Sequence, residues 1–154
     1  MSNYYLDTSA LVKRYINEIG SAWLRALVDA ALSPVLVVSQ LLIVEMTSAF
    51  NRRLREGTVN RDDYIRMMDA FRDDCLAEYK IMPLDESIID LACELLERHP
   101  LRAYDAIHLG TTLVINRLLM AHRMPALTFL CADERLLNAA TAEGLAVDNP
   151  NHHP

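Results

Sequence analysis

The sequence predicts an α/β fold, a three-layer α/β/α sandwich with a central parallel sheet. Short apolar runs of strand length alternate along the chain with longer segments whose apolar residues recur at helical spacing. Strands that are apolar throughout, rather than at every second residue, are typical of a parallel sheet that helices cover on both faces. The 154 residues contain no internal repeat and no Pro/Gly-rich linker, so we expect one domain over residues 1–150 and a disordered tail at 151–154.

The first half of the chain contains two expected strands and three expected helices. In order, these are a strand at 4–6, helices at 9–16 and 21–32, a strand at 34–38 and a helix at 40–56. The run at 34–38 is rich in β-branched valine, which favours a strand. Ser39 can cap the helix that follows this strand, and Gly57 can end that helix.

The second half continues the alternation and adds three strands. In order, we expect a helix at 61–77, a strand at 80–82, helices at 86–98 and 103–119, a strand at 127–131, a helix at 134–142 and a strand at 145–147. Asp85 can cap the helix at 86–98. The helix at 103–119 follows Pro100 and is strongly apolar, and Gly144 can end the last helix.

Composition narrows the compartment and the partners. The chain has 21 acidic and 15 basic residues, a net charge of −6, which by itself disfavours nucleic acid as a partner. The three cysteines, Cys75, Cys93 and Cys131, lack CxxC spacing and indicate a reducing cytoplasm rather than a disulfide framework or a zinc ribbon. We find no signal peptide, and the apolar runs are too short to span a bilayer, so we expect a cytoplasmic protein without membrane contact.

Four acidic residues stand alone in apolar segments, where an ionised carboxylate needs compensation. Asp7 and Asp133 each follow an expected strand, and Asp105 lies near the start of an expected helix. Taken singly, these three are explained by helix capping or by the helix dipole. Glu45 lies inside its helix, beyond any capping position and with apolar residues one turn away, so it needs a partner.

A metal ion would compensate all four acids together. In open parallel sheets, ligands bind beyond the carboxyl ends of the strands, which is where Asp7 and Asp133 are expected. Four carboxylates meeting there would repel one another without a cation. A hard divalent ion with oxygen ligands, Mg²⁺ or Mn²⁺, would remove this repulsion. Such ions polarise phosphoryl oxygens and activate water, as phosphodiester hydrolysis requires.

Five parts of the chain carry a family resemblance: residues 5–12, Glu45 in its apolar helix, and residues 102–109, 132–140 and 144–150. They resemble the PIN-domain ribonucleases and, more narrowly, the VapC-type toxins of prokaryotic toxin–antitoxin pairs. The resemblance implies a PIN-like, Rossmann-like nuclease domain over 1–150. It also implies an endoribonuclease that hydrolyses RNA phosphodiester bonds with Mg²⁺ or Mn²⁺, and catalytic and metal-binding roles for Asp7, Glu45, Asp105 and Asp133. The implied partners are an RNA substrate, a small DNA-binding antitoxin and a second copy of the chain in a homodimer.

Three further residues lie close to the similar motifs. Thr8 matches a position whose hydroxyl lines the pocket in the family. Cys131 departs from the pattern, because many relatives carry Ser or Thr there, and we assign it no role since a thiol is a poorer hydrogen-bond partner for a metal-bound water. His108 follows Asp105 at metal-ligand spacing, but the chain lacks the paired Glu-x-x-His motifs of a di-iron bundle. We therefore expect a histidine that serves helix packing, and contact with the pocket is the alternative.

Basic residues offset the unfavourable net charge locally. Arg52, Arg53 and Arg55 follow Glu45 on the same helix, and Arg52 lies two turns on, on nearly the same side. We expect them to be candidates for contact with the RNA backbone. The alternative is a solvated helix end, where cations also favour the helix dipole.

Three hypotheses from different classes are open. The first is a metal-dependent endoribonuclease that acts as a toxin. The second is a catalytically silent PIN-like module that binds RNA or a partner, and the intact set of four acids argues against it. The third is a phosphoacceptor or small-molecule phosphatase domain, since doubly wound sheets also carry paired acids at strand ends. No lysine or phosphoacceptor motif stands at the strand ends to favour this third hypothesis.

Overall fold

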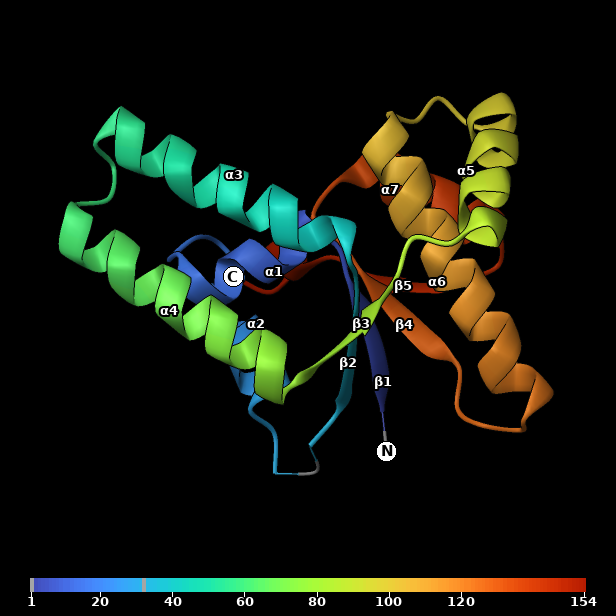
Figure 1. The fold of residues 1–154 in the computed structure, drawn as a ribbon. Coiled ribbons are helices and arrows are strands. Elements are labelled where there is room, and N and C mark those ends of the chain that lie inside the picture. Colours follow the sequence, from blue (N-terminus) through green and yellow to red (C-terminus); the bar gives the residue numbers. More distant parts are fainter. Residues whose placement is uncertain (1, 32) are drawn as a thin grey trace.

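A five-stranded parallel sheet forms the centre of the computed structural model, which describes residues 2–31 and 33–154 (Figure 1). The strands are β1 (Asn3–Leu6), β2 (Val35–Ser39), β3 (Tyr79–Met82), β4 (Leu127–Leu130) and β5 (Ala146–Asp148). They lie side by side in the order β3-β2-β1-β4-β5, and each neighbouring pair is parallel. The parallel sheet expected from the apolar runs is therefore confirmed.

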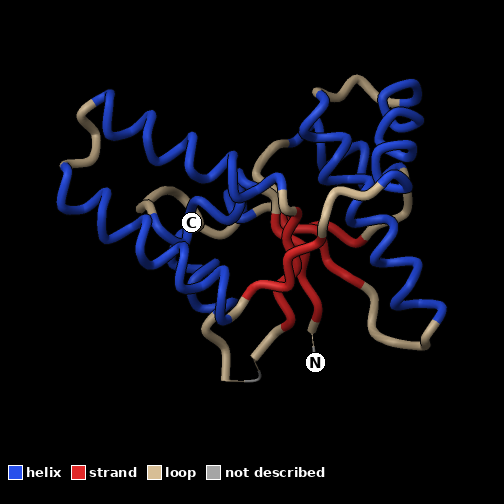
Figure 2. The backbone as a smooth tube through the Cα atoms, in the orientation of Figure 1, coloured by secondary structure: helices blue, strands red, loops and turns tan. Residues whose placement is uncertain are grey.

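Helices cover both faces of this sheet, as Figure 2 shows. The described residues form α1 (Thr8–Tyr15), α2 (Ser21–Val28), α3 (Leu41–Glu56), α4 (Arg61–Ala77), α5 (Glu86–Arg98), α6 (Ala103–Ala121) and α7 (Glu134–Ala142). Helices α1 to α4 share one apolar cluster with the sheet, and α5 to α7 share a second cluster on the opposite face. The arrangement is the three-layer α/β/α sandwich that the sequence predicts.

Polar side chains and one glycine set the ends of the helices. Asp7, Asn60, Asp85 and Asp133 each occupy an N-cap position and accept a backbone N–H from the first turn of the following helix. This satisfies donors that have no partner within the helix. Gly57 ends α3 in the left-handed conformation, with a φ of 73°, which a residue without a Cβ adopts readily.

The two apolar clusters draw on alternate residues of each strand. On β1, the fully buried Tyr5 belongs to the cluster beneath α5 to α7, and the fully buried Leu6 to the cluster beneath α1 to α4. In the second cluster the rings of Phe50 and Phe71 meet edge to face with centroids 6.0 Å apart, which joins α3 to α4. Truncating a buried phenylalanine to alanine costs roughly 3–5 kcal/mol, so such contacts contribute much of the stability of this layer.

The order of the strands creates a crevice beside β1. From β1 the chain passes outward to β2 and β3, and it later crosses back to β4 on the other side of β1. Ligands of open parallel sheets bind at such a switch point, outside the carboxyl ends of the two strands. Asp7 directly follows β1 and Asp133 comes shortly after β4, so the topology places both acids at this crevice.

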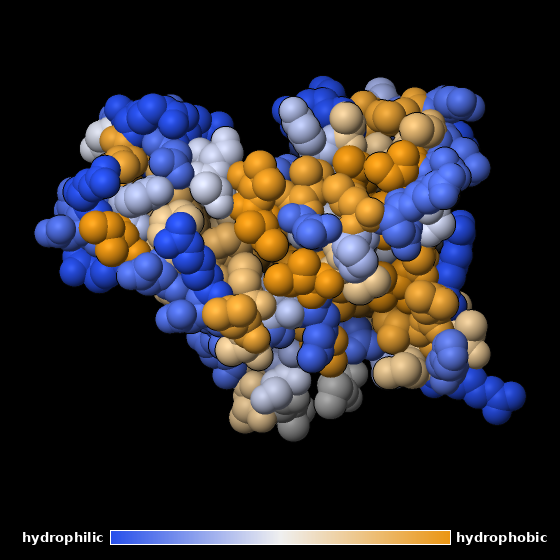
Figure 3. Space-filling model, viewed as in Figure 1, coloured by the Kyte–Doolittle hydropathy of each residue, from blue (hydrophilic) through white to orange (hydrophobic). Residues whose placement is uncertain are grey.

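The face of the molecule drawn in Figure 3 is hollowed between the part that carries α3 and α4 and the part that carries α5 and α6. Hydrophobic side chains gather over the centre of this face. Across the surface of the described residues, large apolar side chains with high exposed fractions include Val44 at 68%, Leu76 at 90% and Met120 at 62%. Exposed apolar groups that form a contiguous patch mark surfaces for association.

Several element boundaries differ by one or two residues from the sequence-based expectation, and the end of α2 differs by more. Helix α2 ends at Val28, before the expected end of that helix at Leu32, and Leu32 itself lies outside the described residues. Strand β2 begins at Val35 rather than at Pro34, because a proline has no N–H to give to a neighbouring strand. Among the helices of the described residues, none is long and apolar enough to cross a membrane.

The chain end also differs from the expected disordered tail at 151–154. Residues Pro150–His152 form a 3-10 turn that follows β5. The ring of His153 stacks on Trp23 of α2 with centroids 4.0 Å apart, and its Nε2 lies 2.8 Å from an oxygen of Asp148. Aromatic stacking and a polar contact thus hold these residues against the helix, two interactions that sequence position does not reveal.

Candidate functional site

A cavity of about 260 Å³ lies at the carboxyl ends of β1 and β4. All four acids that the sequence singled out line this cavity: Asp7, Glu45, Asp105 and Asp133. They come from the start of α1, the second turn of α3, the first turn of α6 and the start of α7. The fold therefore brings four segments that are distant in sequence to one place.

Asp7 is almost fully buried, with 5% of its surface exposed. Its Oδ1 accepts hydrogen bonds from Ser9 Oγ at 2.7 Å and from the backbone N–H of Ala10 at 3.0 Å, and its Oδ2 accepts one from Cys131 Sγ at 3.1 Å. Burial raises the pKa of Asp7, although nearby His108 and these hydrogen bonds act in the opposite direction. The carboxylate is thus held in one orientation, and among the described residues no Lys or Arg forms an ion pair with it.

Glu45 has the partners that its position inside a helix requires. Thr8 Oγ1 donates to Glu45 Oε1 at 3.0 Å, and Nε2 of His108 lies 2.5 Å from the same oxygen. On the other side of the imidazole ring, Nδ1 lies 2.8 Å from the hydroxyl of Tyr5. Burial and the charges of Asp7 and Glu45 raise the pKa of Tyr5 well above its ordinary value, so this hydroxyl keeps its proton. With a neutral imidazole, Tyr5 donates to His108 and His108 donates to Glu45.

Asp105 and Asp133 share a guanidinium group. Arg102 Nε lies 3.4 Å from Asp105 Oδ2, and Arg102 Nη2 lies 3.3 Å from Asp133 Oδ2. The side chain of Arg102 is 69% exposed, whereas those of Asp105 and Asp133 are 14% and 30% exposed. The other oxygen of Asp133 accepts the backbone N–H of Arg135 at 2.9 Å, as an N-cap does. Arg102 therefore supplies positive charge between two acids of the cavity.

The arginines of α3 divide into two groups. Arg52 and Arg53 line the cavity, and Arg55 is not among its lining residues. Arg53 forms an ion pair with Glu18, whose other oxygen lies 3.2 Å from Lys13 Nζ. Two of the three arginines expected to contact a phosphate backbone therefore stand next to the four acids, one of them with an anionic partner.

Two residues, His108 and Cys131, make contacts beyond those expected from the sequence. His108 is not simply a packing histidine, because it lines the cavity and contacts Glu45. The signal was the three-residue spacing from Asp105, which places both on one side of the same helix. Cys131 touches two acids, since its Sγ also lies 3.2 Å from the backbone nitrogen of Asp133, so this thiol helps to set the geometry of the site.

Sequence reasoning missed two residues altogether. Arg102 precedes Asp105 by three positions, and this helical spacing next to an acid could have drawn attention to it. Ser9 bridges two segments, because its hydroxyl donates to Asp7 and accepts the backbone N–H of Ala132 at 2.9 Å. No pattern in the sequence around Ser9 predicts its contact with Ala132.

The donors suit a divalent cation, although they are not arranged around one in this structure. Among the described residues, no three carboxylate, imidazole or thiol groups converge as ligands on a single point. Arg102 bridges Asp105 and Asp133, and protein donors hold Asp7 and Glu45. Carboxylate oxygens are the ligands that Mg²⁺ and Mn²⁺ prefer. A cation bound here would take over the compensating role of the Arg102 guanidinium.

The chain is similar in sequence and in fold to known proteins. The model of the PIN domain family matches residues 4–140. Ribonuclease VapC45 of Mycobacterium tuberculosis (strain CDC 1551 / Oshkosh) is 32% identical over 148 residues, covering 93% of this chain and 92% of that protein. Two solved structures, each 16% identical, share the fold. PAE2754 from Pyrobaculum aerophilum has a TM-score of 0.62 over 98% of this chain and 85% of its own, and a toxin–antitoxin complex from Klebsiella pneumoniae has 0.59 over 96% and 97%.

Proposed function

Because this chain belongs to the PIN-domain family, we propose that it is a Mg²⁺- or Mn²⁺-dependent endoribonuclease and the toxin of a type II toxin–antitoxin pair. One observation carries the proposal: four carboxylates from four segments line a single cavity at the switch point of the sheet. The full-length similarity to a protein named as a VapC ribonuclease supports the reaction class. The substrate is RNA, and the reaction is hydrolysis of its phosphodiester bonds.

Asp7, Glu45, Asp105 and Asp133 are the residues that would hold the metal. A bound divalent cation would compensate these charges and polarise a phosphoryl oxygen. Burial disfavours the charged form of Asp7, so the gain from a nearby cation is large at this position. Because Arg102 is mostly exposed, its side chain can leave Asp105 and Asp133 without disturbing the core.

The other residues of the cavity position the acids and the substrate. Thr8 and His108 orient the Glu45 carboxylate, since both contact the same oxygen. Ser9 fixes one oxygen of Asp7 and ties the start of α1 to the segment that follows β4. Arg52, on the rim, is suited to hold a phosphate of the bound strand.

The test of this site is Asp7→Asn. Asparagine preserves the N-cap acceptor for Ala10 and removes the charge. We expect RNA cleavage in Mg²⁺ or Mn²⁺ to be lost, while the metal-free protein unfolds at the same or a higher temperature because a buried charge is gone. Added Mn²⁺ should raise the melting temperature of the wild type, since a ligand that binds only the folded state stabilises it, and should leave the variant unchanged.

Arg102→Gln is the matched variant on the other side of the cavity. Removal of the competing guanidinium should let Mn²⁺ raise the melting temperature at lower concentrations than in the wild type. The metal assignment would be refuted if Asp7→Asn cleaved RNA at the wild-type rate. It would also be refuted if Mn²⁺ stabilised the wild type and Asp7→Asn equally. RNA binding without cleavage under every metal condition would favour a catalytically silent module instead.

We place this enzyme in the cytoplasm, as a homodimer that a small DNA-binding antitoxin restrains. Three free cysteines suit a reducing compartment, and exposed apolar side chains such as Val44 and Leu76 offer surface for association. The contact of Arg102 with two acids indicates how an inserted arginine of a partner could block the cavity.

Induction of this chain alone should arrest growth, Asp7→Asn should abolish the arrest, and the neighbouring small protein should relieve it. Sedimentation of the pure protein tests the dimer.

A further inference from the structure

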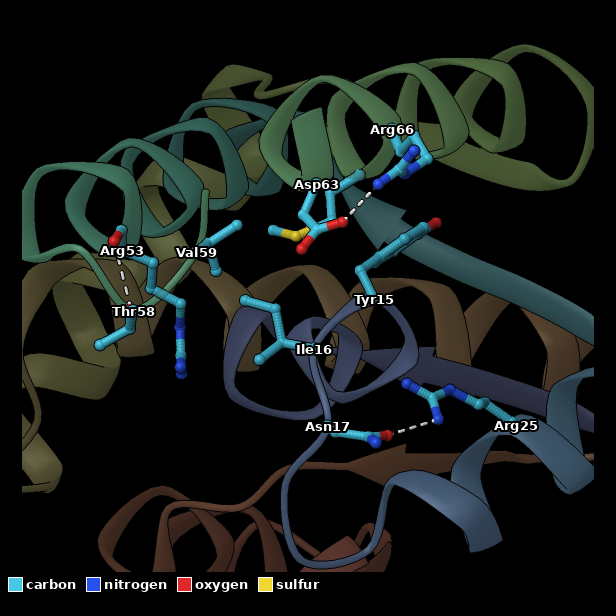
Figure 4. Close-up of a pocket in the computed structure, with 10 residues that line it drawn as sticks. Tyr15, Ile16, Asn17, Arg25, Arg53, Thr58, Val59, Asp63 and Arg66 are labelled. Atoms are coloured by element: carbon cyan, nitrogen blue, oxygen red, sulfur yellow. Dashed lines mark hydrogen bonds and ion pairs between the residues drawn. The ribbon is translucent and has the colours of Figure 1, made fainter. Parts of the chain in front are cut away.

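A second and larger groove, of about 570 Å³, lies next to the acid-lined cavity. Its walls come from the end of α1, from α2, and from the hairpin formed by α3 and α4. In Figure 4, Ile16 and Val59 lie at the centre of the groove. Arg53 lies on one side of them, and Arg25 and Arg66 lie on the other. We call this feature the arginine groove.

The charge of the arginine groove is opposite to that of the protein as a whole. Its lining residues include three arginines from three helices and a single acid, Asp63, in a chain whose net charge is −6. Asp63 pairs with Arg66 and Glu18 pairs with Arg53, and the excess of arginine over acid among the lining residues favours ligands of negative charge. The arginine groove is therefore suited to an anionic partner.

The guanidinium groups of Arg25 and Arg66 are oriented but not saturated. Arg25 Nε donates to the backbone oxygen of Arg14 at 2.9 Å, and Arg25 Nη1 donates to Asn17 Oδ1 at 2.7 Å. These two bonds fix the plane of the group and leave further N–H donors for a ligand. Arg66 pairs with Asp63 at 2.6 Å on the surface of α4, with 73% of its side chain exposed. Exposed pairs of this kind contribute little to stability, so a phosphate can replace the aspartate readily.

Arg53 connects the arginine groove with the acid-lined cavity, because it lines both. A strand whose scissile phosphate lies at the four acids can therefore continue past Arg53 into the groove. Between the arginines, Ile16 and Val59 present an aliphatic surface against which ribose or base faces can pack. A positively charged groove that tracks the backbone is one part of the way in which proteins hold single-stranded nucleic acid.

We propose that the arginine groove binds the backbone phosphates of the single-stranded RNA next to the scissile bond, with Arg25 and Arg66 as the contacts. The proposal rests on the proposed endoribonuclease function and adds the path that the substrate takes away from the acids. Arginine suits this role because its planar group can hold two phosphate oxygens at once.

The experiment measures binding of a mixed-sequence single-stranded RNA to the full chain across a salt series. All proteins carry Asp7→Asn, so that the RNA is not cut. The double variant Arg25→Gln/Arg66→Gln should bind roughly 10- to 30-fold more weakly near 0.1 M salt. The slope of log affinity against log salt should fall by about 1.4, since each lost phosphate contact removes about 0.7 for single strands.

Two controls separate this effect from general loss of charge or of fold. Arg72→Gln/Arg117→Gln removes the same charge from exposed positions of α4 and α6 and should keep the parental slope. Arg25→Lys/Arg66→Lys keeps the charge and should restore most of the salt dependence. Thermal unfolding of each protein identifies a variant whose RNA binding is weak because the protein is misfolded. In that case the Arg25→Lys/Arg66→Lys protein, compared with its parent, tests the proposal.

The possible results distinguish failure of the groove from failure of the function. Equal affinity and slope for the arginine-groove variant and its parent would overturn the proposal, as would an equal loss for the Arg72/Arg117 pair. If RNA binding is unchanged but binding to the antitoxin is lost, the groove is a protein-binding surface instead. Proteins with an intact Asp7 are assayed for Mn²⁺-dependent cleavage in parallel. If cleavage persists and the groove variants have no effect on RNA binding, only the groove proposal is refuted. If the wild type neither binds nor cleaves RNA, both proposals are refuted.

Discussion

Replacing Tyr5 with phenylalanine removes one oxygen atom from the interior of the protein and keeps the ring. Tyr5 is fully buried on β1, and its ring packs against Phe129 with centroids 5.6 Å apart, a contact that phenylalanine retains. The hydroxyl is the partner of His108 Nδ1 at 2.8 Å, and only 2% of His108 is exposed. The substitution therefore leaves a buried imidazole nitrogen without that partner.

The size of the effect follows from this geometry. A buried polar group that loses its partner costs about 1–3 kcal/mol, and no carbon atom is removed that would leave a larger cavity. For a domain of this size, each kcal/mol lowers the melting temperature by about 2–4 °C. The expected decrease for Tyr5→Phe is therefore about 2–12 °C.

Thermal unfolding of the metal-free protein measures this cost, and Tyr4→Phe is the matched control. Tyr4 precedes Tyr5 on the same strand, is half-buried and packs against the other apolar cluster. Its substitution should change the free energy of unfolding by less than about 0.5 kcal/mol. A Mn²⁺ titration gives a second readout, because His108 orients Glu45 through its other nitrogen. We expect Mn²⁺ to stabilise Tyr5→Phe less than it stabilises Tyr4→Phe.

The reasoning would be refuted if both variants melted together and responded equally to Mn²⁺. That result would mean that His108 holds Glu45 without help from Tyr5. A loss of stability with an unchanged response to Mn²⁺ would confine the role of Tyr5 to the core.

Two further predictions concern the stability of the fold. Burial alone would raise the pKa of Glu143, but hydrogen bonds from His99 and Arg98 outweigh it and lower the pKa. The ionised form therefore stabilises the fold above a pH of about 4.3, the ordinary pKa of glutamate. This stabilisation is lost as the pH falls through the lowered pKa. At pH 7 the free energy of unfolding of Glu143→Gln should therefore be about 0.5–1 kcal/mol lower than that of the wild type, and the difference should vanish in acid. A difference that stays constant with pH would contradict a lowered pKa. Gly20 has a φ of 84°, and an added Cβ would lie 2.1 Å from a backbone oxygen of the closing 3-10 turn, so Gly20→Ala should cost about 2–4 kcal/mol in thermal unfolding. Gly57→Ala, with a φ of 73° and open space around the Cβ position, should cost about 1 kcal/mol, and equal losses for the two glycines would exclude the clash.

Local patterns were sufficient for the secondary structure and for the identity of the four acids. Strand and helix order follow from apolar spacing and from caps such as Asp85 and Gly57, which depend on residues within one turn. An acid in an apolar segment is conspicuous for the same local reason. Glu45 was the clearest case, because nothing within its own helix could compensate its charge.

The partners of those acids depend on packing between distant segments. Tyr5 and His108 are separated by 103 positions, and Asp7 and Cys131 by 124, so no periodicity within either segment records that they touch. Arg102 provides a further example, because its contact with Asp133 exists only once α6 and α7 are placed beside β4. Hydrogen bonds and ion pairs are short-range and directional, so their pairing is settled when the sheet brings the segments together. The burial of apolar residues needs no particular partner, so their spacing can be recognised in the sequence alone.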